Sequence, residues 1–320
     1  MFYYDRGLKL RDVPLALDSR TGQPYGFVSH AHADHFARHQ VTVCTPTTAR
    51  LLGVRWKIRE VRELPYRSVW KWHGCRLQTF PAGHMCGSAM LLVETPYGKL
   101  LYTGDFQLRP SRTSEPAEVP QADVLVMEST YGQPEFRFPD ESVLIELLQE
   151  AINRARRRKR IPLVRAYQMG KAQEATRVLC DLGYEVMIDP RLEKAHRAYV
   201  DSGVDLGPFR LFDPKRVADC VLVAPPPRTK GPPADLDPDA CHEIVLSGWT
   251  LLPQYRSRYR ADDFVPWSDH ADFDELIECV ERTGAKRVYC LHGQDTFIQQ
   301  LARRGVKAHW LREGSVLRDF

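Results

Sequence analysis

The chain has 320 residues, 43% of them hydrophobic and 27% charged, with a formal net charge of +4. This composition is that of an ordinary globular protein with room for more than one domain, and the mildly basic charge permits a polyanionic partner. The first residues lack the apolar core of a signal peptide, no apolar run reaches the roughly 18 residues of a membrane span, and the eight cysteines form no compact disulfide framework. These features argue against a membrane protein and a secreted one, and they predict a soluble cytoplasmic protein with no membrane partner.

The first predicted strand with a polar end comprises residues 15–18. It ends at Asp18, directly before a turn formed by residues 19–22. A carboxylate at this place could orient a metal ligand on a neighbouring loop, or it could simply begin the turn. The residues favour neither interpretation.

Four potential metal ligands follow the next buried strand, which ends near residue 28. They are His30, His32, Asp34 and His35. We expect residues 33–38 to form a short helix, so that the ligands lie on the turn between strand and helix. Two histidines two residues apart on extended backbone can bind one ion, and Asp34 and His35 suit a second. Imidazole and carboxylate groups favour zinc, manganese or iron over calcium.

Three further strands lead into side chains of ligand type. His84 lies between two glycines in the loop after a strand, and glycine lets backbone approach a crowded centre. Asp105 ends a hairpin, and Glu128 ends the apolar strand 124–128. Each acid alone would more often be an ordinary turn residue. Together these strand ends predict one rim on which the side chains meet.

The middle of the chain follows a different pattern. From residue 136, helices alternate with apolar strands, which predicts a mostly parallel sheet with covered faces. The last section returns to the earlier pattern, with His270 before a helix and His292 after a strand. The sequence therefore predicts a metal-binding domain with an α/β domain inserted into it. The expected ranges are 1–135 plus 265–320 for the first domain and 136–264 for the insertion.

The inserted part carries basic and turn-forming segments. The basic residues between 154 and 160 end a long helix, where they complement the helix dipole. They are typical of a solvated surface, and contact with a phosphate backbone is the alternative. The turn before Lys171 could hold an anion at a helix N-terminus. The proline-rich residues 225–233 predict a stiff surface connection.

Seven motifs follow one another in the chain. They are His30-x-His32-x-Asp34-His35, Gly83-His84, Thr103-Gly104-Asp105, Glu128-x-Thr130-Tyr131-Gly132, Gly170-Lys171-Ala172-Gln173-Glu174, Ser268-Asp269-His270 and His292-Gly293. This ordered set resembles the β-CASP nucleases of the metallo-β-lactamase superfamily, and it runs through nearly the whole chain. The short length and the wording of the motifs are similar to the bacterial DNA-ligase-associated exonuclease branch.

The resemblance implies a fold and a set of site residues. The implied fold is α/β, an αβ/βα metallo-β-lactamase sandwich with an inserted β-CASP α/β domain. The implied cofactors are two divalent ions, zinc or manganese, bridged by Asp105. The ligands implied for one ion are His30, His32 and His84, and those for the other are Asp34, His35 and His292.

The resemblance also implies catalytic and substrate-binding residues. Glu128 and His270 match the acidic and histidine motifs beside the scissile phosphate, and Asp34 joins them as a catalytic residue. The implied substrate contacts are Lys171, Gln173, Ser247 and Gly248. One departure concerns Asp269, because relatives often carry a small residue there.

The function implied is that of a metal-dependent phosphodiesterase. We expect a nuclease, more specifically an exonuclease, that hydrolyses DNA in a repair context by two-metal activation of a bridging water. His270, held by Glu128, would contact the phosphate and protonate the departing oxygen. The implied partners are nucleic acid, with DNA favoured over RNA, and a DNA ligase and a helicase of a repair pathway.

Three alternatives remain open from the sequence. An RNA-processing β-CASP ribonuclease is the first, because histidine at the position of His292 is commoner in RNA-cleaving members. A small-substrate metallo-hydrolase is the second, although it would have no reason for an inserted domain. A non-catalytic binding subunit is the third, although such subunits lose ligands and none is missing here.

Overall fold

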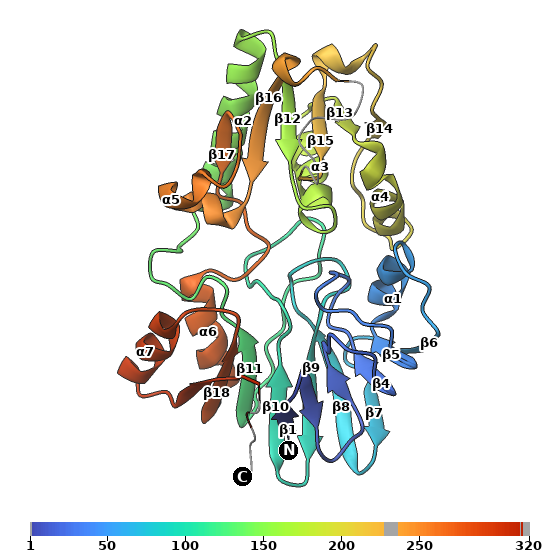
Figure 1. Ribbon diagram of the computed structural model, residues 1–320, viewed down its shortest axis with the longest axis vertical. Coiled ribbons are helices and arrows are strands. Elements are labelled where there is room, and N and C mark those ends of the chain that lie inside the picture. The colour runs from blue at the N-terminus through green and yellow to red at the C-terminus, as the bar shows by residue number, and fades with distance from the viewer. Residues whose placement is uncertain (1, 227–235, 314, 316–320) are drawn as a thin grey trace. The chain divides into compact units, whose positions relative to one another are not determined.

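The computed structural model describes residues 2–226, 236–313 and 315 (Figure 1). The chain folds into two compact units. The first unit contains Met1–Pro134 and His270–Phe320, and the second contains Glu135–Asp269. Most of the proline-rich segment predicted at 225–233 lies outside the described residues. Within the described ranges, every helix is too short or too polar to cross a bilayer.

The first unit contains two sheets, one of six strands and one of seven. One sheet has the order β1 (Phe2–Tyr4), β2 (Leu8–Leu10), β3 (Ala16–Leu17), β4 (Tyr25–Phe27), β5 (Val41–Cys44) and β6 (Glu60–Glu63). The other has the order β19 (Ala308–Trp310), β18 (Arg287–Leu291), β11 (Val124–Glu128), β10 (Gly98–Tyr102), β9 (Ala89–Thr95), β8 (Cys75–Pro81) and β7 (Val69–Trp72). Helices α6 (Phe273–Thr283) and α7 (Asp295–Arg303) lie beside β18, and α1 (Pro46–Gly53) lies near β5 and β6 (Figure 1).

Two apolar cores cover the seven-stranded sheet, one on each face. In β9, Leu91 and Val93 pack in the core that both sheets of this unit share. Met90 and Leu92 point the other way, into the core under α6 and α7. Alternate side chains of a strand lie on opposite faces, so a strand buried on both faces needs a continuous apolar run. Each such side chain contributes about 1.5–3 kcal/mol when fully buried.

The ends of three parallel strands meet at one edge of this sheet. Strand β11 pairs in parallel with β10 on one side and with β18 on the other. Their carboxyl ends therefore share an edge, and Asp105, Glu128 and His292 lie at or just beyond these ends. This is the edge that the strand-end pattern predicts.

One predicted element is wrong. Residues 33–38 form a turn followed by irregular backbone instead of a short helix. Only a single turn closes, through a hydrogen bond of 3.2 Å from the His35 amide to the His32 carbonyl. Continuing the helix would rotate successive side chains away from each other by about 100° each, whereas here the histidines converge. The chain then runs on to His39, whose ring packs on the backbone of Gly26.

The second unit is built on one parallel sheet. Its order is β14 (Phe209–Leu211), β13 (Val186–Ile188), β15 (Val221–Ala224), β12 (Ile161–Arg165), β16 (Cys241–Leu246) and β17 (Asp263–Val265), and all neighbours are parallel. Helix α2 (Glu141–Arg157) packs on β12, β16 and β17, and α3 (Lys171–Asp181) packs on β13 and β15. The shorter helical elements are η1 (Pro190–Leu192), α4 (Glu193–Val200), η2 (Val217–Asp219), η3 (Pro238–Ala240), η4 (Gly248–Leu251) and α5 (Pro253–Arg256). The alternation of helices and strands therefore produces the predicted parallel sheet.

Candidate metal centre

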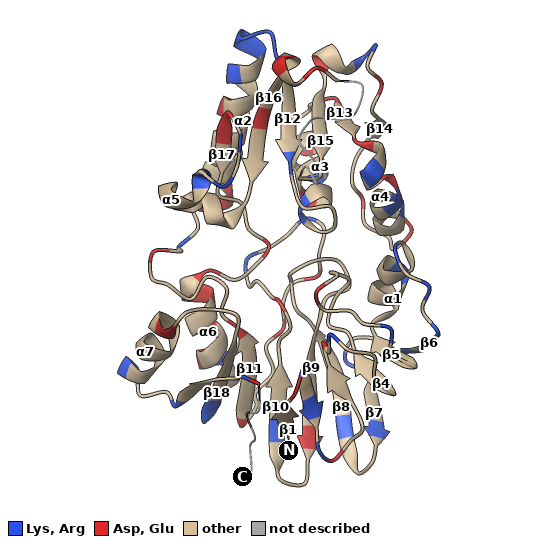
Figure 2. Ribbon diagram, viewed as in Figure 1, with Lys and Arg blue, Asp and Glu red and all other residues tan. Residues whose placement is uncertain are grey.

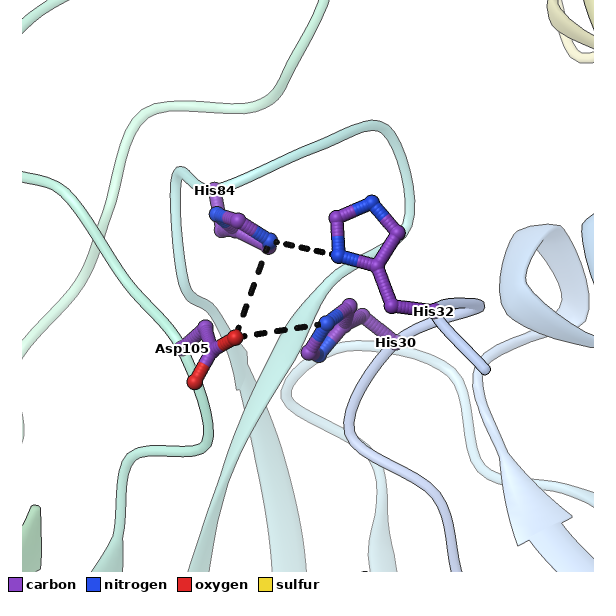
Figure 3. A group of neighbouring side chains, drawn as sticks. All are labelled: His30, His32, His84 and Asp105. Carbon is purple, nitrogen blue, oxygen red and sulfur yellow. Dashed lines mark hydrogen bonds and ion pairs between the residues drawn. The ribbon is translucent and has the colours of Figure 1, made fainter. Parts of the chain in front are cut away.

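Four side chains of ligand type meet at the edge of the first unit. They are His30, His32, His84 and Asp105, and each offers one atom that lies within 4.8 Å of the others (Figure 3). All four are buried. The Nε2 atom of His84 lies 3.2 Å from Nδ1 of His32 and 4.0 Å from Oδ2 of Asp105. These distances leave the donor atoms facing a common point.

The chemistry of this cluster fits a divalent transition-metal ion. The Nε2 atom of His30 is buried without a hydrogen-bond partner and lies 3.6 Å from Oδ2 of Asp105. A buried polar atom without a partner is costly, and coordination to a metal would satisfy it. Burial and the neighbouring imidazoles of His35 and His84 hold the pKa of His30 well below its usual value. The ring therefore stays neutral, as a metal ligand must be.

Asp105 also contacts a second group of donors. Its Oδ2 atom lies 3.2 Å from Nε2 of His35, which in turn lies 3.8 Å from Oδ2 of Asp34. Burial lowers the pKa of His35, but the carboxylates of Asp105 and Asp18 outweigh this effect and raise it well above its usual value. The side chain of Asp34 is 62% exposed. One carboxylate, that of Asp105, thus lies beside both groups of histidines.

His292 is not brought into this arrangement. It follows β18 at a φ of 52°, and its carbonyl accepts hydrogen bonds from the amide and the hydroxyl of Ser129. Its side chain is exposed and lines a surface pocket with Asp295, Trp310 and Arg312. In the part of the chain that the structure describes, it contacts neither Asp34 nor His35. The expectation that it completes their ligand group therefore receives no support from the geometry.

Asp18 orients ligands of both groups. Its carboxylate accepts a hydrogen bond of 2.8 Å from Nδ1 of His35 and one of 2.5 Å from the hydroxyl of Ser29. The same hydroxyl lies 3.0 Å from Nδ1 of His30. The Tyr102 hydroxyl also donates to Asp18, at 2.8 Å. Of the two interpretations of Asp18, the geometry favours the one that orients ligands.

The loop after β8 delivers His84. Gly83 has a φ of +78°, and a Cβ atom there would lie 2.3 Å from the carbonyl oxygen of Gln107. The carbonyl of Gly87, at the other end of the loop, accepts a hydrogen bond of 2.8 Å from the Thr48 hydroxyl. Glycine is required at residue 83 for both its backbone conformation and its close contact.

The buried carboxylate of Glu128 and the half-buried ring of His270 form a pair beside the four-residue cluster. The Nδ1 atom of His270 lies 2.9 and 3.0 Å from the two carboxylate oxygens of Glu128. Glu128 also accepts a hydrogen bond of 2.6 Å from the Thr130 hydroxyl and one of 2.9 Å from the Phe106 amide. The ring centroid of His270 lies 4.6 Å from that of His84. The carboxylate therefore fixes the orientation of an imidazole next to the metal ligands.

Arg109 supports this pair, although no sequence motif marked it. Its Nη2 atom donates a hydrogen bond of 2.9 Å to the carbonyl of His270. Its Nη1 atom pairs with Glu275, whose carboxylate also accepts from the Leu108 amide. Glu275 belongs to a capping box with Asp272 at the start of α6. The spacing of that capping box is readable in the sequence, but its tie to Arg109 depends on tertiary structure.

The second unit holds the predicted substrate contacts. The ammonium group of Lys171 lies 2.9 Å from Oδ1 of Asp269, and both side chains are 12% exposed. Asp269, the residue that departs from the family pattern, is therefore the ion-pair partner of Lys171. The charge of Lys171 is compensated within its own unit.

Two of the predicted contacts are corrected by their burial. Gln173 is fully buried, where it accepts from the Gly170 amide and lies 3.0 Å from Nδ1 of His196. Gly248 is buried at the start of η4, and the Ser247 hydroxyl lies 3.0 Å from that of Tyr259. Gln173 therefore turns its amide inward to support a loop, and Gly248 has no side chain with which to contact a ligand.

Two residues of the basic run at the end of α2 pair with acids. Arg154 makes two hydrogen bonds to Asp263, and Arg160 pairs with Asp262 at 2.7 Å. Arg156 lies over the ring of Tyr184. Figure 2 shows acidic colour on β16 and β17 and basic colour on the end of α2. Residues 156–159 are exposed, which fits the solvated-surface interpretation of this run.

Several named proteins resemble the chain along most of its length. It is 34% identical over 318 residues to a probable DNA ligase of Opitutus terrae, a match that covers 98% of this chain and 31% of that protein. It is 30% identical over 304 residues to the 5′ exonuclease Apollo of Gallus gallus, covering 86% and 61%. It is 23% identical over 304 residues to the endoribonuclease YSH1 of Yarrowia lipolytica, covering 76% and 36%. The chain spans less than two thirds of each of these relatives.

No protein-family model matches the chain. A solved structure, that of a protein of unknown function from Enterococcus faecalis V583, is similar with a TM-score of 0.60 at 15% identity, covering 91% of this chain and 80% of that one. At that identity the likeness shows an α/β fold and nothing about activity. The named relatives, the ordered motifs and the buried histidine–aspartate cluster confirm the resemblance: this chain belongs to the β-CASP nucleases of the metallo-β-lactamase superfamily.

Proposed function

We propose that the protein is a metal-dependent phosphodiesterase that cleaves the backbone of nucleic acids. The observation that carries this proposal is the buried set of His30, His32, His84 and Asp105 beside the pair formed by Glu128 and His270. We assign the first unit as the metallo-β-lactamase sandwich. We assign the second unit as the inserted β-CASP domain.

The proposed cofactors are two divalent ions, zinc or manganese. Nitrogen and carboxylate donors suit both metals. When bound, such ions neutralise phosphate charge and lower the pKa of a bound water. The proposed ligands of the first ion are His30, His32, His84 and Asp105. Those of the second are Asp34, His35 and Asp105.

The proposed roles of Glu128 and His270 follow from their hydrogen bonds. Glu128 accepts a hydrogen bond from Nδ1–H of His270, so Nε2 is the ring atom that can give a proton to the departing oxygen. Arg109 holds the carbonyl of the same residue and keeps the ring from moving with its loop. Asp34, whose side chain is exposed, would hold a metal ion on the side open to an entering phosphate.

We propose DNA as the substrate, in a repair context. The support is the likeness to a probable DNA ligase along 98% of this chain and to a protein named 5′ exonuclease. We also propose a DNA ligase and a helicase as partners, because the chain resembles the DNA-ligase-associated branch of the family. RNA cleavage is the second candidate, because His292 carries the residue type of RNA-cleaving members and one relative is named an endoribonuclease.

The test offers the protein labelled nucleic acids in the presence of manganese or zinc. The substrates are single-stranded DNA, duplex DNA and RNA, each labelled at the 5′ or the 3′ end, so that product lengths report polarity and mode of cleavage. We expect His32→Ala to lose bound metal and all cleavage. We expect His270→Ala to retain metal while cleavage slows by about 10²- to 10⁴-fold.

The matched control is His309→Ala, which removes an exposed histidine of β19. It should cleave like the unmodified protein. Full activity of His270→Ala would remove that residue from the mechanism. Turnover of nitrocefin or a thioester, without cleavage of any nucleic acid, would instead identify a small-substrate hydrolase.

A further inference from the structure

We propose that a cluster of arginines and aromatic rings in the second unit binds single-stranded nucleic acid. We call it the α5 cluster and define it as Trp249, Tyr255, Arg256 and Arg258. The inference rests on the proposed function and extends it, because it names the strandedness of the substrate. None of these residues belongs to a motif of the metal centre.

The rings of the α5 cluster pack against a buried aromatic side chain. Phe136 is fully buried, and its ring centroid lies 5.4 Å from that of Trp249 and 6.1 Å from that of Tyr255. The rings of Trp249 and Tyr255 are 5.2 Å apart, and both residues are half-buried. A half-exposed ring anchored in this way loses little entropy when a planar group stacks on it.

One arginine of the cluster lies over these rings, and the other lies over the nearby ring of Phe264. The guanidinium of Arg258 is 4.5 Å from the ring centroid of Tyr255 and 6.0 Å from that of Trp249. Arg256 lies over Phe264 at 5.6 Å and donates to the carbonyl of Thr250 at 2.9 Å. Among the described residues, no carboxylate lies within 4.0 Å of the charged groups of these two arginines. Within the described part of the chain, the α5 cluster therefore presents two arginines that form no ion pair.

Other arginines of the second unit differ in this respect. Among the described residues, seven of them pair with a carboxylate: Arg154, Arg160, Arg165, Arg177, Arg191, Arg197 and Arg210. Such pairs reduce the local field that attracts a polyanion. The α5 cluster thus combines arginines outside such pairs with two aromatic rings, whereas Arg156 lies over the single ring of Tyr184.

This combination fits a single strand better than a duplex. The bases of a single strand expose their faces, and any base can stack on an aromatic ring while arginine contacts the backbone. A duplex keeps its bases stacked inside and offers no face to a ring. The cluster also follows the carboxyl end of β16, and ligands of parallel α/β sheets bind at the carboxyl ends of strands.

The test measures binding of the whole protein to a fluorescent, phosphorothioate-linked oligothymidylate of about 16 nucleotides. Arg258→Ala should weaken binding about 10-fold and should reduce the slope of log K against log salt by about 0.7, the value for one phosphate contact on a single strand. Tyr255→Leu should weaken binding with the salt slope unchanged. A duplex of the same length should compete poorly, and an oligouridylate should bind like the oligothymidylate because stacking ignores the 2′-hydroxyl.

The matched control is Arg197→Ala, an arginine of α4 that is 71% exposed and paired with Glu193. It should bind like the unmodified protein. Unchanged binding by Arg258→Ala, or equal loss in the control, would overturn the inference. Hydrolysis of bis(p-nitrophenyl) phosphate reports the metal centre separately and should be unchanged in Arg258→Ala. If the protein hydrolyses no phosphodiester but still binds the strand through Arg258, the proposed function fails and the inference stands.

Discussion

Asp18 shows how much one buried carboxylate can organise. It accepts hydrogen bonds from the side chains of His35, Ser29 and Tyr102, and from the Ser29 amide. Its backbone has a φ of 42°, a conformation that favours asparagine, aspartate and glycine. Through His35 directly, and through Ser29 to His30, it sets the ring orientation in both ligand groups.

We predict that Asp18→Asn weakens metal binding by about 10- to 100-fold, the usual cost of removing a group that orients a ligand. Asparagine tolerates the same backbone conformation, so the effect reports the lost charge and hydrogen bonds. Competition with a coloured chelator measures the affinity. The control is Tyr102→Phe, which removes a single hydrogen bond to Asp18 and should have a smaller effect. Equal affinities in Asp18→Asn and the unmodified protein would contradict the assignment.

His196 predicts how stability depends on pH. It belongs to α4 and is buried against α3, and burial lowers its pKa from 6.5 to about 4. Protonation is therefore easier in the unfolded chain, so the contribution to stability is complete above pH 6.5 and is lost as pH falls toward 4. The loss between pH 7 and pH 4.5 is about 2–3 kcal/mol. Urea unfolding at the two pH values should show a smaller loss in His196→Gln. An identical pH dependence in both proteins would argue against a neutral buried ring.

At the scale of elements, local pattern predicts strands better than it predicts turns. Strands such as β11 and β18 are apolar on both faces, so their sequence reports their burial, and their parallel pairing brings Asp105 and Glu128 to one edge as expected. The backbone of residues 33–38 depends instead on distant groups, including Asp18 and Asp105. No local sequence pattern could therefore show that this segment forms a turn and irregular backbone instead of a helix.

The same limit applies to single site residues. A motif places Gln173 next to Lys171, but it cannot show that the amide turns inward to His196 while the ammonium group reaches Asp269. Arg109 lies in no motif at all. Its role depends on the hydrogen bond that it donates to the carbonyl of His270, and only the tertiary structure shows that contact. The ligand types and their strands were therefore predictable from the sequence. The supporting hydrogen bonds, and the side-chain direction of His292, were not.

The loop after β8 allows a matched test of backbone geometry. Gly83→Ala introduces a Cβ atom at positive φ that would lie 2.3 Å from the Gln107 carbonyl oxygen, so the loop must move and carry His84 with it. We predict lower zinc content after dialysis, measured by mass spectrometry. Gly74→Ala is the control, since Gly74 also has positive φ but no atom within 4 Å of its Cβ position. Gly74→Ala should lower the free energy of unfolding by about 1–2 kcal/mol and leave the zinc content unchanged. Equal zinc loss in the two variants would refute this explanation.

At the scale of the whole molecule, each unit has an apolar core of its own. We therefore predict two thermal transitions in calorimetry. Metal at 100 times its Kd should stabilise only the first unit, by about 2.7 kcal/mol. Leu148→Ala empties a fully buried position of α2 and should lower the other transition, at a cost of about 2–5 kcal/mol. A single transition that both changes move would show that the units unfold together.

The pairing of β11 with β18 has a consequence for biosynthesis. A ribosome makes β11 well before β18, and the entire second unit emerges between them. Until then β11 lacks a neighbour on one side, and an open strand edge invites wrong partners. The hydrogen bond between His270 and Glu128 also cannot form before the second unit has been made, because His270 follows that unit in the chain. The nascent protein therefore brings the proposed catalytic groups of the first unit together only after the second unit and β18 have been synthesised.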